Sequence, residues 1–426
     1  MNRIYLILLL ISGLAKSPYG TIQCYGKNPR SEQRKEMLVM LKEKVLNRMV
    51  RRIVLCFLTL LVSSPLVSAS ESSFFEMQEL FKGRGGRSIV VAVDGTVLAF
   101  HGRLLRRSGD GGKTWSEVRK IGDDAGGNAL VNETNGEILL VQAGKGYLWK
   151  SKDNGQNWIR EEIKILPDGL GFGTPDGVFL KVGAMQSGIT LQFGEHKGRL
   201  LMPARLQGPK ASNAVEWRPY HYSTAIYSDD GGKTWQVSKP FPVFGTGEAA
   251  LAEISDGSIL YSSREHMSKG NRYFAWSYDG GELWLSPYRS DTLPDGARGS
   301  SYGCMGGLIR LPDEKHDILI YSNLDSDEGS MPEEVGASTG SGREKITVWA
   351  SFDGGKTWPV KRLVFDGPSA YSNLGVGRVG KPSSEGKIYL LFEGGPEGRK
   401  SAVNVAVFNL SWLLEGHDLN EFIKND

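Results

Sequence analysis

Residues 227–235 read YSDDGGKTW, and this stretch decides the fold. Gly231 and Gly232 allow backbone angles that other residues resist, so Asp-Gly-Gly predicts a tight hairpin turn. Trp235 can then fold back onto the sheet beyond the turn. The same pattern, S-x-D-x-G-x-x-W, occurs at 108–115, 151–158, 277–284 and 351–358. One such turn is a local feature, but five copies indicate a repeated architecture.

The spacing of the copies indicates what is repeated. Their aspartates, at positions 110, 153, 230, 279 and 353, lie 43, 77, 49 and 74 residues apart, and one four-stranded propeller blade takes about 40–50 residues. Short β-type runs such as 88–93, 97–100 and 138–142 fill the intervals, and helical periodicity is nearly absent before 410–423. The sequence therefore predicts an all-β, six-bladed β-propeller with a short C-terminal helix. Pairing of 74–81 with strands at 387–392 and 404–408 would close the ring.

The first 69 residues differ from the rest of the chain. They hold two apolar runs, 4–14 and 53–62, and the second has a basic start at 49–52 and small residues at 67–69. This is the pattern of a secretory signal peptide. We therefore expect upstream translation through residue 48, a signal peptide at 49–69, a propeller domain at 70–426, and a secreted or periplasmic protein. A membrane anchor is the alternative, but the run is short for a span.

Composition excludes several function classes. The formal charge is +3, but residues 1–69 carry +8, so the remainder carries −5 and offers no basic face for nucleic acid. Only Cys304 lies beyond the leader, so no disulfide is expected within the propeller. The six histidines show no metal-ligand spacing, and no cofactor is predicted.

The five repeats resemble the Asp boxes of sialidases, and further motifs extend the resemblance over roughly residues 84–412. Glu248 precedes LAEISDG, and Arg264 follows Glu248 by sixteen residues, as in the sialidase pattern. Arg343 stands before the strand that leads into the last repeat, in GREKITVWASFDGGKTW. Tyr371 lies in AYSNL, where the family has its nucleophilic tyrosine. Glu393, in LFE, stands where the family has a glutamate that holds its first arginine.

The chemistry of sialic acids explains why such residues are needed. The sugar carries a carboxylate on its anomeric carbon, which would repel a carboxylate nucleophile. A neutral phenol avoids this repulsion, but its pKa near 10 calls for an adjacent base. The resemblance thus implies Tyr371 as nucleophile and Glu248 as its base, in the tyrosine variant of glycoside hydrolysis. Arg264 and Arg343 would bind the substrate carboxylate, because guanidinium groups pair with carboxylates bidentately.

The chain departs from the family pattern at two places. Alignment puts Gly85 where the family has its first arginine, so Arg84 or Arg87 must substitute; Arg87, two residues on, keeps the same strand facing. The loop that carries the family's acid/base aspartate has shrunk to residues 101–107 and holds no Asp. His101, in that loop, and Asp176, in GFGTPDG, are the two replacements considered.

The sequence therefore predicts a retaining exo-sialidase that acts on sialylated glycans or glycoproteins, or on a related 2-keto acid sugar. Two alternatives stay open. An Asp-box propeller that binds glycans or proteins without hydrolysis would explain the missing acid/base Asp. A glycosidase acting on another polysaccharide would leave Arg264, Arg343 and Tyr371 without a role.

Overall fold

The computed structural model describes residues 72–168, 181–207, 221–300, 302–326 and 342–423. All described residues lie in the second of the two units into which the chain divides, residues 71–426. The predicted upstream segment and signal peptide lie outside the described residues and stay predictions. Among the described residues, no helix has the length and apolar character needed to cross a membrane.

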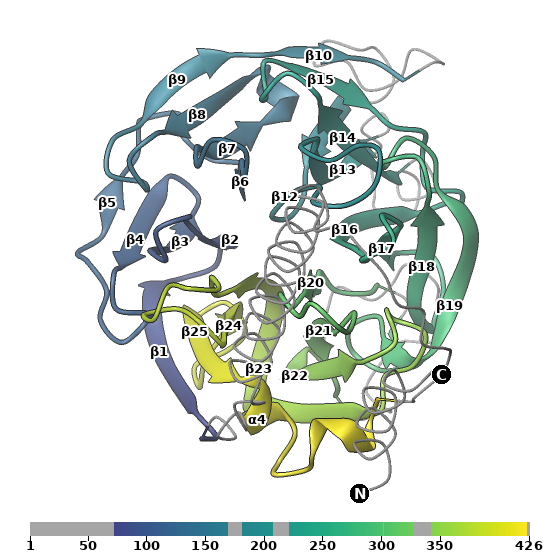
Figure 1. Cartoon of the computed structure of the whole chain (residues 1–426). Helices are drawn as coiled ribbons and strands as arrows, with labels where there is room; N and C mark the ends of the chain where they lie inside the picture. Colours follow the sequence, from purple (N-terminus) through teal and green to yellow (C-terminus); the bar gives the residue numbers. More distant parts are fainter. Residues whose placement is uncertain (1–71, 169–180, 208–220, 301, 327–341, 424–426) are drawn as a thin grey trace, which may run out of the picture. The chain divides into compact units, whose positions relative to one another are not determined.

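In the described residues, four self-contained sheets follow one another along the chain around a central axis, and the inner strand of each lies nearest to that axis (Figure 1). The first comprises β2 (Gly86–Val91), β3 (Val97–His101), β4 (Leu104–Ser108) and β5 (Arg119–Lys120). The second comprises β6 (Asn128–Val131), β7 (Ile138–Gln142), β8 (Tyr147–Ser151) and β9 (Ile159–Glu162), with the 3-10 turn η1 (Ala143–Lys145). The third comprises β10 (Lys164–Leu166), β11 (Lys181–Ala184), β12 (Ile189–Thr190), β13 (Leu200–Gln207), β14 (Tyr222–Ser228) and β15 (Thr234–Val237). The fourth comprises β16 (Thr246–Glu253), β17 (Ile259–Glu265), β18 (Asn271–Ser277) and β19 (Leu285–Pro294).

A seven-stranded sheet completes the arrangement. Its order is β1 (Phe75–Lys82), β25 (Ala402–Asn409), β24 (Lys387–Gly394), β23 (Val360–Val376), β22 (Glu344–Ser351), β21 (Leu319–Leu324) and β20 (Gly307–Arg310). β1 pairs antiparallel with β25, from Phe75 opposite Phe408 to Lys82 opposite Ala402, which confirms the predicted closure by the two ends of the domain.

The prediction of six separate blades is wrong. The described residues form four separate sheets and one continuous sheet, because the 17-residue strand β23 runs through the place where a boundary was expected. Its first half pairs with β22 and its second half with β24. The all-β class and a β-propeller-like arrangement are nevertheless what the structure has.

The five repeats form the turns between β4 and β5, β8 and β9, β14 and β15, β18 and β19, and β22 and β23. In the third, the Ser228 hydroxyl donates to Asp230 Oδ1 at 2.8 Å and accepts from Gly232 N at 2.9 Å. Asp230 Oδ1 also accepts from the backbone N of Lys233 and Thr234. The other four repeats have the same serine–aspartate and glycine–serine bonds. These aspartates are turn formers, as predicted.

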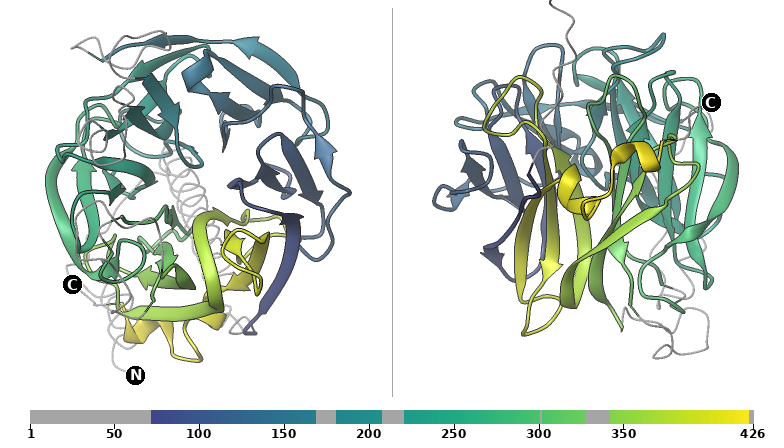
Figure 2. Two further views of the ribbon diagram at one scale, coloured as in Figure 1. Left: turned by 180° about the vertical axis from the view of Figure 1, so that it is seen from behind. Right: turned by 60° about the horizontal axis from the view of Figure 1, so that its bottom comes forward.

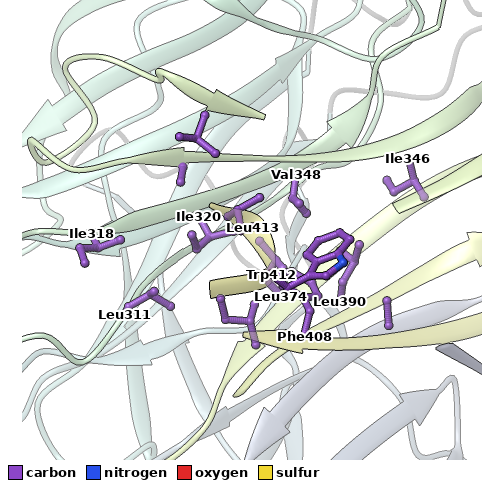
Figure 3. Close-up of a cluster of buried hydrophobic side chains, with 14 of the residues drawn as sticks. Leu311, Ile318, Ile320, Ile346, Val348, Leu374, Leu390, Phe408, Trp412 and Leu413 are labelled. Carbon is purple, nitrogen blue, oxygen red and sulfur yellow. The ribbon is translucent and has the colours of Figure 1, made fainter. Parts of the chain in front are cut away.

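The predicted C-terminal helix is shorter than the pattern suggested. It comprises α4 (Leu410–Leu413) and the separate 3-10 turn η3 (Leu419–Glu421), because Glu415 and Gly416 take positive φ angles of 53° and 89°. Trp412 of α4 stacks on Phe75 of β1, with ring centroids 4.6 Å apart. Figure 2 shows the helix against the seven-stranded sheet, and Figure 3 shows Trp412 among Leu374, Leu390 and Phe408 in the apolar core.

Candidate functional site

Glu248 and Tyr371 both lie at irregularities of their strands. In β16 the pairing with β17 shifts register between Thr246 and Ala249, and Glu248 lies inside that interval. In β23 the pairing with β24 shifts between Ser369 and Ser372, and Tyr371 lies inside it. Register shifts redirect side chains out of regular alternation. The two side chains consequently meet, although 123 residues separate them in the sequence.

The contacts between these side chains define the centre of the site. The Tyr371 hydroxyl donates to Glu248 Oε1 at 3.4 Å. Arg264, near the end of β17, donates from Nη1 to the Tyr371 hydroxyl at 3.3 Å and forms an ion pair with Glu248 Oε2. The arrangement places a phenol between a carboxylate and a guanidinium group.

Two backbone carbonyls of one segment anchor the arginines. Arg264, which is 1% exposed, donates from Nε and Nη2 to Tyr302 O at 3.0 and 2.8 Å. Arg343 donates from Nη2 to Gly303 O at 2.7 Å, and its Cζ lies 5.5 Å from the ring centroids of both Tyr302 and Tyr371. A side chain at position 303 would collide with Glu265 O, 2.7 Å from an added Cβ, so glycine is needed there. The two guanidinium groups are thus fixed beside the same tyrosine.

The electrostatics keep Glu248 ionised and Tyr371 protonated at neutral pH. Burial acts to raise the pKa of Glu248, but the positive charges of Arg264 and Arg205 outweigh it and hold this pKa well below its usual range. The negative charge of Glu248 raises the pKa of Tyr371, and burial adds to this effect, whereas Arg264 and Arg343 oppose it. The site therefore presents a phenolic O–H to a carboxylate that can accept its proton.

The predicted residues of the first-arginine region are Arg84, Arg87 and Glu393. Glu393 of β24 is buried, and its Oε1 accepts from Gly85 N at 2.7 Å. The side chain of Arg84 is exposed. Arg87 lies in β2, but its side chain is outside what the structure describes. Neither arginine is therefore singled out as the third member of the cluster.

Of the two acid/base candidates, the structure describes only His101. His101, at the end of β3, pairs its Nε2 with Arg84 O at 2.7 Å and packs against Phe81, with ring centroids 5.1 Å apart. Among the described residues, its contacts do not include Tyr371 or Glu248. Asp176 lies outside the described residues.

Sequence reasoning missed three residues near Glu248. Arg205 of β13 places Nη1 3.7 Å from Glu248 Oε1. His266 is buried, and its pKa is held well below the usual value by burial and by the charge of Arg264. Tyr302 packs its ring 4.5 Å from Arg264 Cζ. His266 follows Arg264 by two residues, just beyond the end of β17, and this closeness in sequence is the signal that could have found it.

The described residues contain no group of three or more His, Cys, Asp or Glu side chains arranged to hold a metal ion. What they do provide is a phenol next to a carboxylate, together with two fixed guanidinium groups. This set can bind a carboxylate and activate a hydroxyl by proton transfer.

Comparison with known proteins shows which family this chain resembles. Residues 142–382 match the family described as BNR repeat-like domain. A sialidase from Micromonospora viridifaciens is 27% identical over 412 residues, covering 83% of this chain and 56% of the relative. A sialidase from Bacteroides fragilis is 26% identical over 310 residues, covering 62% of this chain and 49% of the relative. The chain thus spans about half the length of these two relatives.

Solved structures share the fold at low identity. The intramolecular trans-sialidase from Ruminococcus gnavus, solved with oseltamivir carboxylate, has a TM-score of 0.58 at 14% identity and covers 81% of this chain and 96% of its own. A protein of unknown function from Dyadobacter fermentans has a TM-score of 0.54 at 16% identity and covers 78% of this chain and 99% of its own. With the family match over more than half of its residues, this chain belongs to the BNR repeat-like domain family within the sialidase superfamily.

Proposed function

We propose that the protein is a retaining exo-glycosidase that releases terminal sialic acid, or a related 2-keto acid sugar, from glycans or glycoproteins. The observation that carries the proposal is the contact of the Tyr371 hydroxyl with Glu248 Oε1 at 3.4 Å, beside Arg264 and Arg343. The sialidases among the relatives support the same reaction class.

The arginines account for substrate binding. A sialic acid is anionic at neutral pH, and Arg264 and Arg343 offer guanidinium groups that backbone carbonyls already hold in place. Fixed donors lose little conformational entropy when the ligand arrives. Binding of the carboxylate there would bring the anomeric carbon, to which it is attached, next to the Tyr371 hydroxyl.

The covalent steps follow from the tyrosine–glutamate pair. Glu248 accepts the phenolic proton as the Tyr371 oxygen attacks the anomeric carbon, and the bond from that carbon to the leaving oxygen breaks. The leaving oxygen takes a proton from an acid, for which His101 and Asp176 remain the sequence-derived candidates. Water then attacks the anomeric carbon and gives one proton to the deprotonated acid. The bond from that carbon to Tyr371 breaks, and the tyrosine oxygen takes its proton back from Glu248. Two displacements at one carbon retain its configuration.

Release of a fluorescent phenol from an aryl α-sialoside tests the proposal. An aryl leaving group departs without much help from an acid, so the assay depends on Tyr371 rather than on the unidentified acid. Tyr371→Phe keeps the ring and removes the attacking oxygen, and we expect kcat to fall by at least about 1,000-fold.

Tyr389→Phe is the matched control. Tyr389 is fully buried in β24, and its hydroxyl has no hydrogen-bond partner among the described residues, so its loss should leave activity and folding unchanged. Full activity in folded Tyr371→Phe would refute the nucleophile assignment. A folded parent protein that binds sialosides but releases no phenol would favour the non-hydrolytic propeller instead.

A further inference from the structure

Glu248 lies between two guanidinium groups, which lie beside different oxygens of its carboxylate. Arg264 pairs with Oε2, whereas Arg205 approaches Oε1 from β13, on the neighbouring sheet, with Nη1 at 3.7 Å. Oε1 is also the oxygen to which Tyr371 donates. Arg205 therefore faces the atom that must receive the phenolic proton.

Arg205 is held differently from the structural arginine nearby. Arg272, on β18, is fully buried and uses all three guanidinium nitrogens. Its Nη1 donates to Asp295 Oδ1 and Cys304 O, both at 2.8 Å, its Nε donates to Ser262 Oγ at 3.0 Å, and its Nη2 donates to Glu248 O at 3.3 Å. The side chain of Arg205 is 15% exposed, its ion-pair distance is long, and its buried Nε has no hydrogen-bond partner among the described residues. Among the described residues, the Arg205 guanidinium is thus held by fewer contacts than that of Arg272.

We infer that Arg205 is a positioning residue of the sialidase site, which keeps Glu248 ionised and its Oε1 directed at the Tyr371 hydroxyl. The inference rests on the proposed function. It states that Arg205, a residue of β13, controls how strongly the base Glu248 binds a proton. Two positive charges make Glu248 a weak proton acceptor in the empty site. A substrate carboxylate paired with Arg264 would offset one of these charges, and Arg205 would then be the guanidinium that still acts on Oε1.

Several other groups act on Glu248, and Arg205 is one of the two that lower its pKa most. Among the described residues, the charged and titratable side chains that act on its carboxyl are Arg205, Arg264, His266, Cys304 and Tyr371, and Arg272 donates to its backbone oxygen. Loss of one opposite charge at this range raises a carboxyl pKa by about one to three units. Removal of Arg205 should therefore shift the ionisation of Glu248 upward by at least about one unit.

Titration of the Glu248 carboxyl tests the inference without using activity. In protein labelled with ¹³C-glutamate, the Glu248 signal is identified by its loss in Glu248→Gln. We expect this signal to titrate at least about one pH unit higher in Arg205→Gln than in the parent. Arg205→Lys keeps the charge and should stay close to the parent. Arg378→Gln is the matched control, because Arg378 is also a partly buried arginine paired with a carboxylate, Glu133, at 2.7 Å.

The pH profile of aryl sialoside cleavage provides the second readout. The acid limb of kcat/KM should move to higher pH in Arg205→Gln, and Arg205→Lys should restore it. An unchanged Glu248 titration in folded Arg205→Gln would overturn the inference. If the parent shows no cleavage, the proposed function fails, but the carboxyl titration still decides whether Arg205 controls Glu248.

Discussion

Alanine at Gly232 should destabilise the protein far more than alanine at its neighbour Gly231. Both glycines have positive φ angles, 93° and 73°, which cost an L-residue about 1–2 kcal/mol. They differ in the space beside them. A Cβ at 232 would lie 2.8 Å from Leu139 Cδ1 of the neighbouring sheet, whereas a Cβ at 231 would meet nothing nearer than Asn132 Nδ2 at 3.9 Å.

The magnitudes follow from these distances. Leu139 is fully buried, so it cannot move aside freely, and overpacking of a core costs about 1–3 kcal/mol. Alanine also lowers the conformational entropy of the unfolded chain, which stabilises both variants by about 0.4–1 kcal/mol. We expect a loss of about 2–4 kcal/mol for Gly232→Ala and of about 1 kcal/mol for Gly231→Ala. The second repeat supports the difference, because it carries Asn154, with φ 55°, at the position of Gly231 and keeps Gly155 at the position of Gly232.

Urea unfolding followed by tryptophan fluorescence measures both variants, because Trp235 of the same turn is fully buried. The free energies are compared at equal slopes. Gly231→Asn serves as a further control and should be close to neutral. Equal losses in the two alanine variants, within about 0.5 kcal/mol, would refute the claim that contact with Leu139 requires the second glycine.

Two pH effects are also expected. Burial raises the pKa of Glu253 to about 7, although backbone N–H groups of Gln192 and Phe193 bond to its carboxyl. The contribution of Glu253 to the free energy of unfolding is therefore present at low pH and is lost as the pH rises through 7. Glu253→Gln should flatten this loss, on the order of 1–2 kcal/mol between pH 5 and 8 in urea unfolding, and an unchanged slope would contradict it. Burial acts to raise the pKa of Asp153, but hydrogen bonds from Asn157, Ser151 and Gln156 lower it to about 2. Its stabilisation is therefore present above about pH 4 and is lost toward pH 2, and Asp153→Asn should show a shallower acid transition in circular dichroism.

The local parts of the fold could be predicted from the sequence. Each repeat carries the serine, the aspartate and the glycines that make its own turn, so five turns and the strands beside them followed from short motifs. The number of separate sheets could not be predicted from such motifs. β23 continues through residues 360–376 because its two halves find different partners, β22 and β24, and strand pairing between distant segments leaves no local signal.

The residues of the candidate site also differ in whether the sequence could reveal them. Glu248, Arg264, Arg343 and Tyr371 were found from motifs, and the structure brings them together. Arg205 was missed because nothing in its own strand distinguishes it; its relation to Glu248 exists only where two sheets meet. Arg205 lies two residues before the end of the described part of this strand, since β13 extends from Leu200 to Gln207.

The sequence by itself determined the repeated turns, the all-β class and four residues of the candidate site, because each depends on side chains close together in the chain or on a motif. Only the tertiary structure decided the continuous seven-stranded sheet, the register shifts that turn Glu248 and Tyr371 toward each other, and the approach of Arg205 to Glu248 Oε1. These depend on contacts between strands that lie far apart in sequence, and it is the packing of whole sheets around one axis that sets them.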